Sequence, residues 1–218
     1  MTRKVSDSTI RRLSLYLRIL ELMDRGGGGT VSSDALASAA GTTAAQVRKD
    51  LSLFGSFGKR GLGYQVADLA QRVRDILGLD RVWRVGLVGA GRIGSALFEY
   101  DAFRRRGFEV VAVLDNDPAK IGSHWGAVPV RDTADLEQVL RDEAVEVVIL
   151  TVPAVAAQEI ADRAVAAGIR GLLNFAPVQL HVPAGVFVQD VNMVMELEAL
   201  SFDLTNRSMA GDAPPTDG

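Results

Sequence analysis

The sequence contains no cysteine, which excludes disulfides, thiolate nucleophiles and cysteine-ligated metal sites. Histidine is nearly absent too, since only His124 and His181 occur. His124 lies in a Gly-Ser-His-Trp-Gly segment and His181 precedes Val-Pro, so we interpret both as surface or loop residues rather than catalysts. No catalytic residue and no metal site are expected.

Long apolar runs are also missing, because no stretch approaches the roughly 18 residues that a membrane span needs. The first residues, Met-Thr-Arg-Lys-Val-Ser-Asp, do not have the pattern of a signal peptide. We therefore expect a cytoplasmic protein without membrane contact. With 48% hydrophobic residues the chain can bury ordinary cores, and its 218 residues favour two modest domains over one.

Charge is distributed unequally along the chain. Residues 1–64 carry ten Lys or Arg against five Asp or Glu, whereas residues 81–218 carry 12 against 19. A basic module followed by an acidic body favours contact with a polyanion through the first part only. The same excess is compatible with a plain solvated surface.

Hydrophobic periodicity predicts three helices in the first part, over residues 7–23, 33–40 and 44–54. The glycines at 26–29 end the first helix, because glycine loses the most conformational entropy when it is held helical. Ser32 or Ser33, and Thr42 or Thr43, are candidate N-caps of the other two.

The second and third helices, joined at Gly41, have the layout of a helix-turn-helix, whose second helix enters the major groove of DNA. Glutamine suits adenine, and arginine or lysine suits guanine. The glycine-rich residues 54–64 predict a hairpin wing with a basic tip that contacts phosphate or the minor groove. The alternative is a small helical packing domain with solvated basic residues. The candidate DNA-binding residues are Gln46, Arg48, Lys49 and Ser52 in the third helix and Lys59 and Arg60 at the wing tip.

After an amphipathic linker helix over 66–77, Gly89, Gly91 and Gly94 follow a predicted buried strand at 83–88 and open a helix at 93–100. This context indicates a dinucleotide-binding turn: the first glycine makes the bend, the second lets the backbone approach a pyrophosphate, and the third lets helix and strand pack closely. Asp115 follows a second strand at 110–114 and stands 21 residues after Gly94. Its carboxylate would accept hydrogen bonds from a ribose 2′-hydroxyl and repel a 2′-phosphate, which favours NADH and NAD+ over NADP(H).

The alternation continues with a helix at 133–143, a strand at 145–152, a helix at 155–167 and a strand at 169–174. This order predicts an α/β fold with a doubly wound parallel sheet of the Rossmann type, whose ligands sit at the carboxyl ends of the strands. The candidate cofactor-binding residues are Gly89, Ala90, Gly91, Arg92, Ile93, Gly94, Asp115, Thr151, Pro153, Asn174 and Phe175.

An NAD-dependent oxidoreductase is the alternative function, but it needs a substrate domain and an acid or base beside the nicotinamide. Only 38 residues follow residue 180, and no such pair is visible, so we expect no enzyme. In a third interpretation the sheet is purely a scaffold.

Helical spacing of apolar residues predicts a C-terminal helix that packs on its own domain or in a second subunit. These residues are Met193, Leu197, Leu200 and Leu204. The expected domains are a DNA-binding module (1–80), a nucleotide domain (81–192), a dimerisation helix (193–207) and a disordered tail (208–218).

Several segments together resemble the Rex family of bacterial redox-sensing transcriptional repressors over nearly the full chain. They are Tyr16-Leu-Arg-Ile-Leu20, Gln46-Val-Arg-Lys-Asp-Leu51, Phe54-Gly-Ser-Phe-Gly58, Arg60-Gly-Leu-Gly-Tyr64, Gly91-Arg-Ile-Gly-Ser-Ala-Leu97, Leu150-Thr-Val-Pro153 and Leu173-Asn-Phe-Ala-Pro177. The resemblance implies a homodimer whose two winged helices bind a pseudo-palindromic operator in double-stranded DNA. It also implies that the Rossmann domains sense the NADH/NAD+ ratio, that NADH releases DNA, and that the targets are respiratory and fermentative genes.

The resemblance also implies roles for individual residues. Arg48 and Lys49 match the family's recognition helix, Arg60 its wing, and the C-terminal helix one that is swapped between subunits. Arg18 and Tyr100 match two residues of a ligand-state relay, whose third member is an aspartate in the family. The matching position is Asn192 here, which cannot form a salt bridge with Arg18, and Asp190 is the alternative partner.

Overall fold

The structure is a computed structural model that describes residues 5–57 and 63–211, with side chains described up to residue 206. It divides into two compact units, Met1–Val82 and Trp83–Gly218, close to the boundary expected after residue 80. Lys59 and Arg60, predicted for the wing tip, lie outside the described residues.

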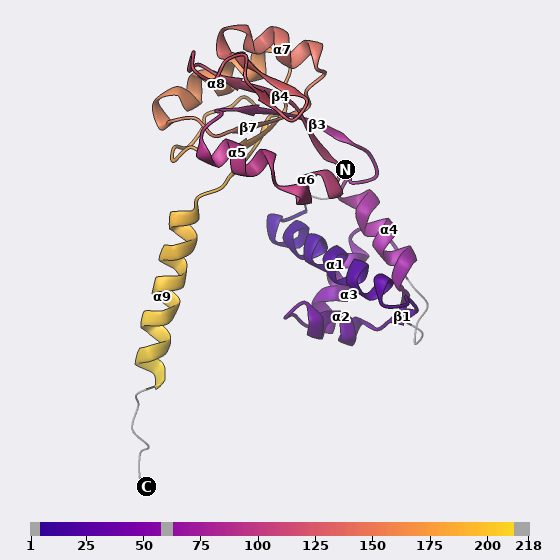
Figure 1. Ribbon diagram of the computed structural model, residues 1–218. Coiled ribbons are helices and arrows are strands. Elements are labelled where there is room, and N and C mark those ends of the chain that lie inside the picture. Colours follow the sequence, from indigo (N-terminus) through magenta and orange to yellow (C-terminus); the bar gives the residue numbers. More distant parts are fainter. Residues whose placement is uncertain (1–4, 58–62, 212–218) are drawn as a thin grey trace. The chain divides into compact units, whose positions relative to one another are not determined.

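The first unit is mainly helical (Figure 1). Its elements are α1 (Asp7–Arg25), β1 (Thr30–Val31), α2 (Ser33–Ala39), α3 (Ala44–Ser52), β2 (Tyr64–Gln65) and α4 (Val66–Ile76). The predicted helices are confirmed, with α3 ending two residues before the expected 54. Their starts follow from N-capping: the side-chain oxygens of Ser6, Ser32 and Thr43 each accept a hydrogen bond from a backbone N–H three residues on.

One apolar core holds these helices together. It is lined by fully buried side chains of every helix, among them Leu13, Leu17 and Leu20 of α1, Leu36 of α2, Val47 of α3 and Val73 of α4. Burying a leucine or valine side chain contributes about 1.5–3 kcal/mol. The unit therefore has a core of its own.

The wing region differs from its prediction. The strand β2 pairs antiparallel with β1, with Val31 opposite Tyr64, rather than with residues 54–57 of the expected hairpin. Pattern reasoning missed β1 because its two residues directly follow the glycine run. Gly63 allows the close approach: it has a φ of +74°, and a Cβ there would lie 2.5 Å from the carbonyl oxygen of Val31.

The second unit contains a seven-stranded sheet in the order β5-β6-β4-β3-β7-β8-β9, in which only β5 is antiparallel (Figure 1). Its strands are β3 (Trp83–Val88), β4 (Phe108–Asp115), β5 (His124–Trp125), β6 (Val128–Asp132), β7 (Val147–Leu150), β8 (Gly171–Asn174) and β9 (Phe187–Asp190). Its helices are α5 (Arg92–Phe98), α6 (Asp101–Arg105), α7 (Leu136–Asp142, after the 3-10 turn Thr133–Asp135), α8 (Ala154–Ala166) and α9 (Met193–Gly211). The doubly wound parallel sheet is thus confirmed.

Alternate side chains of the central strands feed two cores. Val88 and Leu114 pack with α7 and α8, whereas Leu87 and Val113 pack with the side chains of Leu97 and Phe98 from α5. The helix expected over 93–100 is shorter, because the chain breaks at Tyr100 before α6 begins. The strands β5, β6 and β9 were not predicted, and α9 continues past the expected end at 207. No helix within the described residues is both long and apolar enough to cross a membrane.

Candidate functional site

A cavity of about 500 Å³ opens where the central strands of the second unit end. The strand order reverses at β3, since β4 and β6 lie on one side of it and β7, β8 and β9 on the other. Ligands of such sheets bind in the crevice at this reversal. The cavity is lined by Gly89, Gly91, Ile93, Asp115, Asn116, Asp117, Lys120, Thr133, Thr151, Val152, Pro153, Ala156, Ile160, Phe175 and Pro177.

The three glycines of the β3–α5 turn have different structural roles. A Cβ at Gly89 would lie 2.6 Å from the carbonyl oxygen of Thr151, and one at Gly94 would lie 2.1 Å from that of Gly89. These two glycines therefore permit packing of the turn itself. A Cβ at Gly91 would meet nothing within 4 Å, and Gly91 lines the cavity, so its missing side chain leaves room for a ligand.

Asp115 lies at the end of β4 beneath the glycine turn. Its Oδ2 accepts hydrogen bonds from the backbone N–H of Ala90 at 2.6 Å and from Lys120 Nζ at 3.1 Å, and its Oδ1 accepts one from the N–H of Asp117 at 2.8 Å. Burial alone would raise the pKa of Asp115, but these hydrogen bonds outweigh it and lower the pKa below its ordinary value. The carboxylate therefore stays charged beside the cavity.

The other half of the cavity is apolar. Val152, Pro153, Ala156 and Ile160 line it from the β7–α8 side, and Phe175 and Pro177 follow β8. Thr151 closes the turn from below, because its hydroxyl donates to the carbonyl of Gly89 at 2.7 Å. The titratable lining residues lie at or just after the end of β4, on the opposite side of β3: they are Asp115, Asp117 and Lys120.

Asn174 has a different place from the one expected. Its side chain is fully buried, donates to the carbonyl of Val178 and to Asp190 Oδ1, and accepts from the N–H of Ala176. It is not among the cavity-lining residues, and its hydrogen bonds fix the loop that carries Phe175 and Pro177, while its contact with a cofactor stays a prediction.

The remaining expected residues divide clearly. Gly89, Gly91, Ile93, Asp115, Thr151, Pro153 and Phe175 line the cavity. Ala90, Arg92 and Gly94 do not: Ala90 is buried with its N–H bound to Asp115, Arg92 is exposed at the start of α5, and Gly94 is buried against the turn. Sequence reasoning missed Asn116, Asp117 and Lys120, although a turn directly after Asp115 was the available signal.

In the first unit, α3 presents Arg48, Lys49 and Ser52 to solvent. The Ser52 hydroxyl donates to the carbonyl of Lys49 at 2.8 Å, which leaves its lone pairs free. Two exposed cations on one short helix form a surface suited to DNA phosphates and to guanine.

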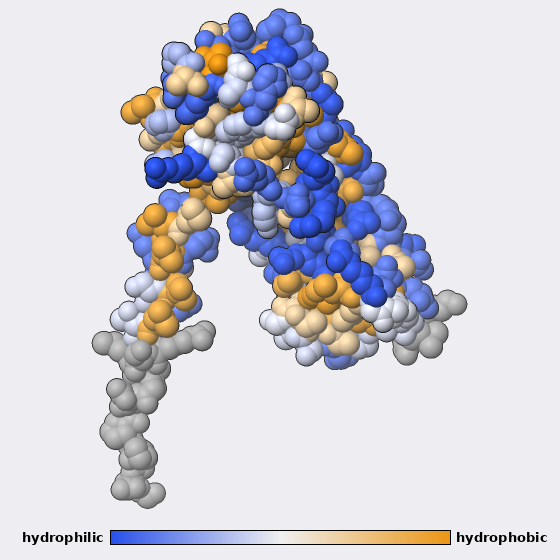
Figure 2. Space-filling view, viewed as in Figure 1, coloured by the Kyte–Doolittle hydropathy of each residue, from blue (hydrophilic) through white to orange (hydrophobic). Residues whose placement is uncertain are grey.

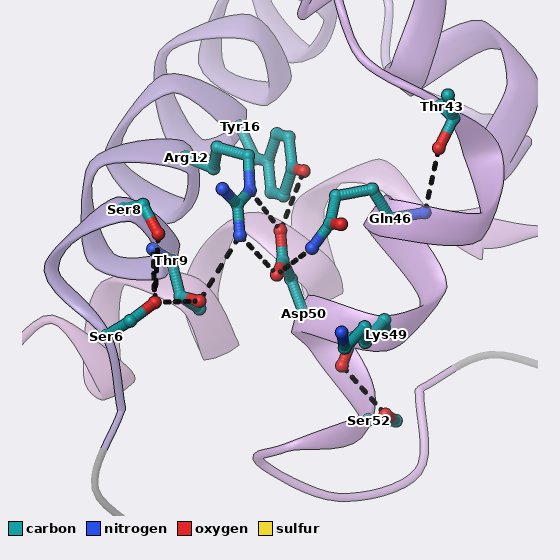
Figure 3. A network of polar contacts seen from close by, with 10 residues as sticks. All are labelled: Ser6, Ser8, Thr9, Arg12, Tyr16, Thr43, Gln46, Lys49, Asp50 and Ser52. Atoms are coloured by element: carbon teal, nitrogen blue, oxygen red, sulfur yellow. Dashed lines mark hydrogen bonds and ion pairs between the residues drawn. The ribbon is translucent and has the colours of Figure 1, made fainter.

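Gln46 faces inward instead, toward a buried carboxylate (Figure 3). Its amide nitrogen donates to Asp50 Oδ1 at 2.7 Å. The adenine contact that the sequence suggested for Gln46 therefore loses support, because this amide is engaged inside the module. The carboxylate itself was not singled out by the sequence, although it stands four residues after Gln46 on the same helix.

Asp50 is 1% exposed and ties α3 to α1. The guanidinium of Arg12 binds both of its carboxylate oxygens, Nε to Oδ2 at 2.6 Å and Nη2 to Oδ1 at 2.8 Å. The hydroxyl of Tyr16 also donates to Oδ2 at 3.0 Å. Burial would raise the pKa of Asp50, but the hydrogen bonds from Arg12, Gln46 and Tyr16 lower it overall. Burial, together with the hydrogen bond to Asp50, raises the pKa of Tyr16 to about 12.

The three residues matched to a relay lie in separate segments. Arg18 is exposed on α1 of the first unit, whereas Tyr100 and Asn192 belong to the second. Asn192 caps α9, since its Oδ1 accepts hydrogen bonds from the N–H groups of Val194 and Met195. Asp190 is engaged by Asn174. Their contact with Arg18 stays a prediction.

The helix α9 exposes an apolar stripe. Met193, Leu197, Leu200 and Leu204 recur at helical spacing, and each is 54–66% exposed. In Figure 2, hydrophobic residues are visible along α9. A stripe of this kind is ordinarily buried against another surface.

Two family models match the chain, and the two matches lie largely in different units. A model described as the putative DNA-binding protein N-terminus matches residues 4–52, and one described as the CoA binding domain matches residues 80–178. The first match covers α1 to α3 and the second covers the glycine turn with most of the sheet.

Relatives match nearly the whole chain. The redox-sensing transcriptional repressor Rex of Carboxydothermus hydrogenoformans is 48% identical over 201 residues, 92% of this chain and 97% of its own length. That of Streptomyces coelicolor is 42% identical over 217 residues, 100% of this chain and 83% of its own length. A solved structure of RSP, a Rex-family repressor, in complex with β-NAD+ and operator DNA has a TM-score of 0.90, 34% identity and 99% coverage of both chains. RSP in complex with β-NADH has a TM-score of 0.86 at the same identity, with 95% of this chain and 97% of that chain covered.

Proposed function

Because this chain belongs to the Rex family of redox-sensing transcriptional repressors, we propose that it binds operator DNA through its first unit and releases it when NADH binds to its second. The observation that carries the proposal is the pairing of an exposed basic helix α3 with a dinucleotide-type cavity in one chain. Relatives of this fold have been solved with NAD+ and operator DNA together, and with NADH. Since a repressor acts where the DNA is, we propose that this protein works in the cytoplasm.

The nucleotide fits the cavity in three respects. The open space at Gly91 admits a pyrophosphate beside the start of α5. Because the N-cap is a glycine, no side chain caps the first N–H groups of this helix, and they can donate to a phosphate. Asp115 supplies a charged acceptor for a ribose hydroxyl. The apolar surface of Val152, Pro153 and Phe175 suits the flat nicotinamide ring.

The same geometry supports a sensor over an enzyme. A nicotinamide cofactor supplies hydride transfer, for which the chain would have to provide a proton donor or acceptor and a place for substrate. Among the described residues that line the nicotinamide half of the cavity, none is titratable. We therefore propose that NADH is read as a signal and is not consumed.

Operator binding is proposed to rest on Arg48, Lys49 and Ser52 of α3, with Lys59 and Arg60 added from the wing. The relay through Arg18, Tyr100 and Asn192 is part of the same proposal. A ligand can shift the DNA-bound population only by its difference in affinity between the two forms of the protein. A coupling of about 2 kcal/mol would change operator affinity about 30-fold.

The deciding experiment is a titration at fixed salt, since contacts with phosphate make affinity depend on salt. A labelled palindromic duplex, selected from a random-sequence pool with the full-length protein, is bound and followed by fluorescence anisotropy while NADH or NAD+ is added. We expect NADH to weaken binding about 30-fold and NAD+ to leave it largely intact. Equal effects of the two nucleotides would contradict a redox sensor, and rapid NADH oxidation with a small substrate would favour the oxidoreductase.

The apolar stripe of α9 supports a homodimer. Replacing both Leu197 and Leu200 by glutamate is expected to weaken the dimer about 100-fold or more, because charged groups cannot be buried unpaired in an apolar interface. Analytical ultracentrifugation over a concentration series measures the change. Glu198→Ala, which changes a charged residue of α9 outside the stripe, is the control, and an unaltered sedimentation profile of the double variant would place the subunit interface elsewhere.

A further inference from the structure

Lys120 brings a positive charge to the β4 side of the cavity. Its Nζ lies 3.1 Å from Asp115 Oδ2 and 3.7 Å from Asp117 Oδ2, and its side chain is 37% exposed and lines the cavity. The turn that carries it is well fixed: the N–H of Lys120 donates to the carbonyl of Asp117, and the N–H of Ala119 donates to Asp117 Oδ1. The backbone of the turn is therefore fixed, and the ammonium lies beside Asp115 through its own contact with that carboxylate.

The hydrogen-bonding capacity at this end of the cavity is complementary to a vicinal diol. A carboxylate can accept about four hydrogen bonds, and Asp115 already accepts three, from Ala90, Asp117 and Lys120. A lysine ammonium has three donors, and its hydrogen bond to Asp115 uses one of them. Asp115 thus retains one acceptor position and Lys120 at least one donor beside it. Each hydroxyl of a ribose diol can donate to the first or accept from the second.

The charge balance has a second consequence. A lone carboxylate at this position repels a 2′-phosphate, which is the ordinary basis for selecting NAD(H) over NADP(H). Here an ammonium stands in contact with that carboxylate and offers a phosphate a partner of opposite sign. Asp117 adds a second negative charge on the other side of Lys120, so the selectivity depends on how these three charges combine.

We propose that Lys120 is a specificity-determining residue of the nucleotide site: it donates to the adenosine ribose hydroxyls together with Asp115, and its charge limits the rejection of NADPH. This inference rests on the proposed nucleotide function and extends it. On this proposal, NADPH is rejected less strictly than it would be if Asp115 stood there without an ammonium beside it.

The test measures the dissociation constants of NADH and NADPH for the full-length protein by calorimetry. Lys120→Met keeps the length of the side chain and removes its charge and donors. We expect the NADH constant to rise about threefold to tenfold and the NADPH constant to rise at least about 100-fold, so that their ratio rises at least about tenfold. Lys120→Arg retains the charge and should keep the ratio within about threefold of the parent.

Asp117→Asn provides the opposite change, because it removes a negative charge beside Lys120 and should improve NADPH binding relative to NADH. Repeating the series at high salt should shrink the differences in ratio, since they are electrostatic in origin. If Lys120 only shaped the turn, Lys120→Met would weaken both nucleotides equally, and an unchanged ratio would overturn the proposal. A parent protein that binds no NADH at all would instead defeat the proposed function itself.

Discussion

Replacing Gly91 by valine is expected to abolish the response to NADH while leaving operator binding at its parental strength. Gly91 has φ and ψ of −85° and −167°, an extended conformation that valine also adopts, and no atom lies within 4 Å of its would-be Cβ. The turn can therefore fold with valine in place. The new side chain fills the space where the backbone must approach a pyrophosphate, so nucleotide affinity should fall at least about 100-fold.

The neighbouring glycines would give a less informative variant. Gly94→Ala would force a Cβ against the carbonyl of Gly89, and Gly89 itself has a φ of +106°, so either change disturbs the turn as well as the ligand. Gly91→Val removes nucleotide binding without disturbing the turn. NADH fluorescence measures the lost binding, anisotropy of the labelled duplex measures the retained operator affinity, and Ala166→Val on the exposed end of α8 is the control. Release of DNA by NADH from the Gly91→Val protein would show that the sensor site lies elsewhere.

The sequence predicted this turn well because its constraints are local. The glycine spacing, the strand before it and the aspartate after the next strand all lie within one βαβ unit, and each carries a steric or electrostatic meaning of its own. The same holds for α2 and α3, whose caps and apolar spacing are read within a few residues. Helix boundaries at Ser32 and Thr43 follow from side chains that are visible in the sequence.

The parts that escaped prediction depend on partners distant in sequence. The strand β9 is recognisable only through its pairing with β8, and β1 only through its pairing with β2. Asn174 reads as a ligand residue because it ends a strand, but its amide is consumed by Val178, Asp190 and Ala176 once the chain has folded. Gln46 reads as a base contact because it lies near the start of the second helix of a helix-turn-helix, but the carboxylate that engages it is itself fixed by a residue 38 positions earlier.

Replacing Arg12 by glutamine is expected to destabilise the first unit by about 3 kcal/mol and to weaken operator binding at least about tenfold. The change removes the two-pronged partner of a carboxylate that is 1% exposed, and leaves only Tyr16 and Gln46 beside it. Operator affinity is expected to fall because Asp50 sits on α3, the helix proposed to contact DNA, and the link that holds this helix against α1 is loosened. Arg12→Lys should recover part of both losses, since it restores the charge without the bidentate geometry.

The design of the measurement follows from where the tryptophans lie. The sequence has two tryptophans, Trp83 and Trp125, and both belong to the second unit. The unfolding transition that tryptophan fluorescence records should therefore keep the denaturant midpoint of the parent. Far-ultraviolet circular dichroism also records the helical first unit and should show an earlier transition. NADH affinity is the matching functional control. A loss of tryptophan signal at the same lower denaturant concentration would contradict a local role for Arg12.

Lowering the pH should change the stability of the first unit in opposite directions in the parent and in the Arg12→Gln variant. In the parent the pKa of Asp50 is lowered, so its ion pair contributes stability above about pH 4, the ordinary aspartate value, and this contribution is lost as the pH falls through the folded-state pKa. Without Arg12, burial is expected to prevail and raise the pKa of Asp50, so the first unit should gain stability as the pH falls from neutral. The double variant Arg12→Gln with Asp50→Asn has no buried charge and should lose both dependences while recovering most of the stability. If the single variant instead loses stability on acidification as the parent does, Arg12 does not control the charge of Asp50, and the recognition helix is held in place by its apolar contacts.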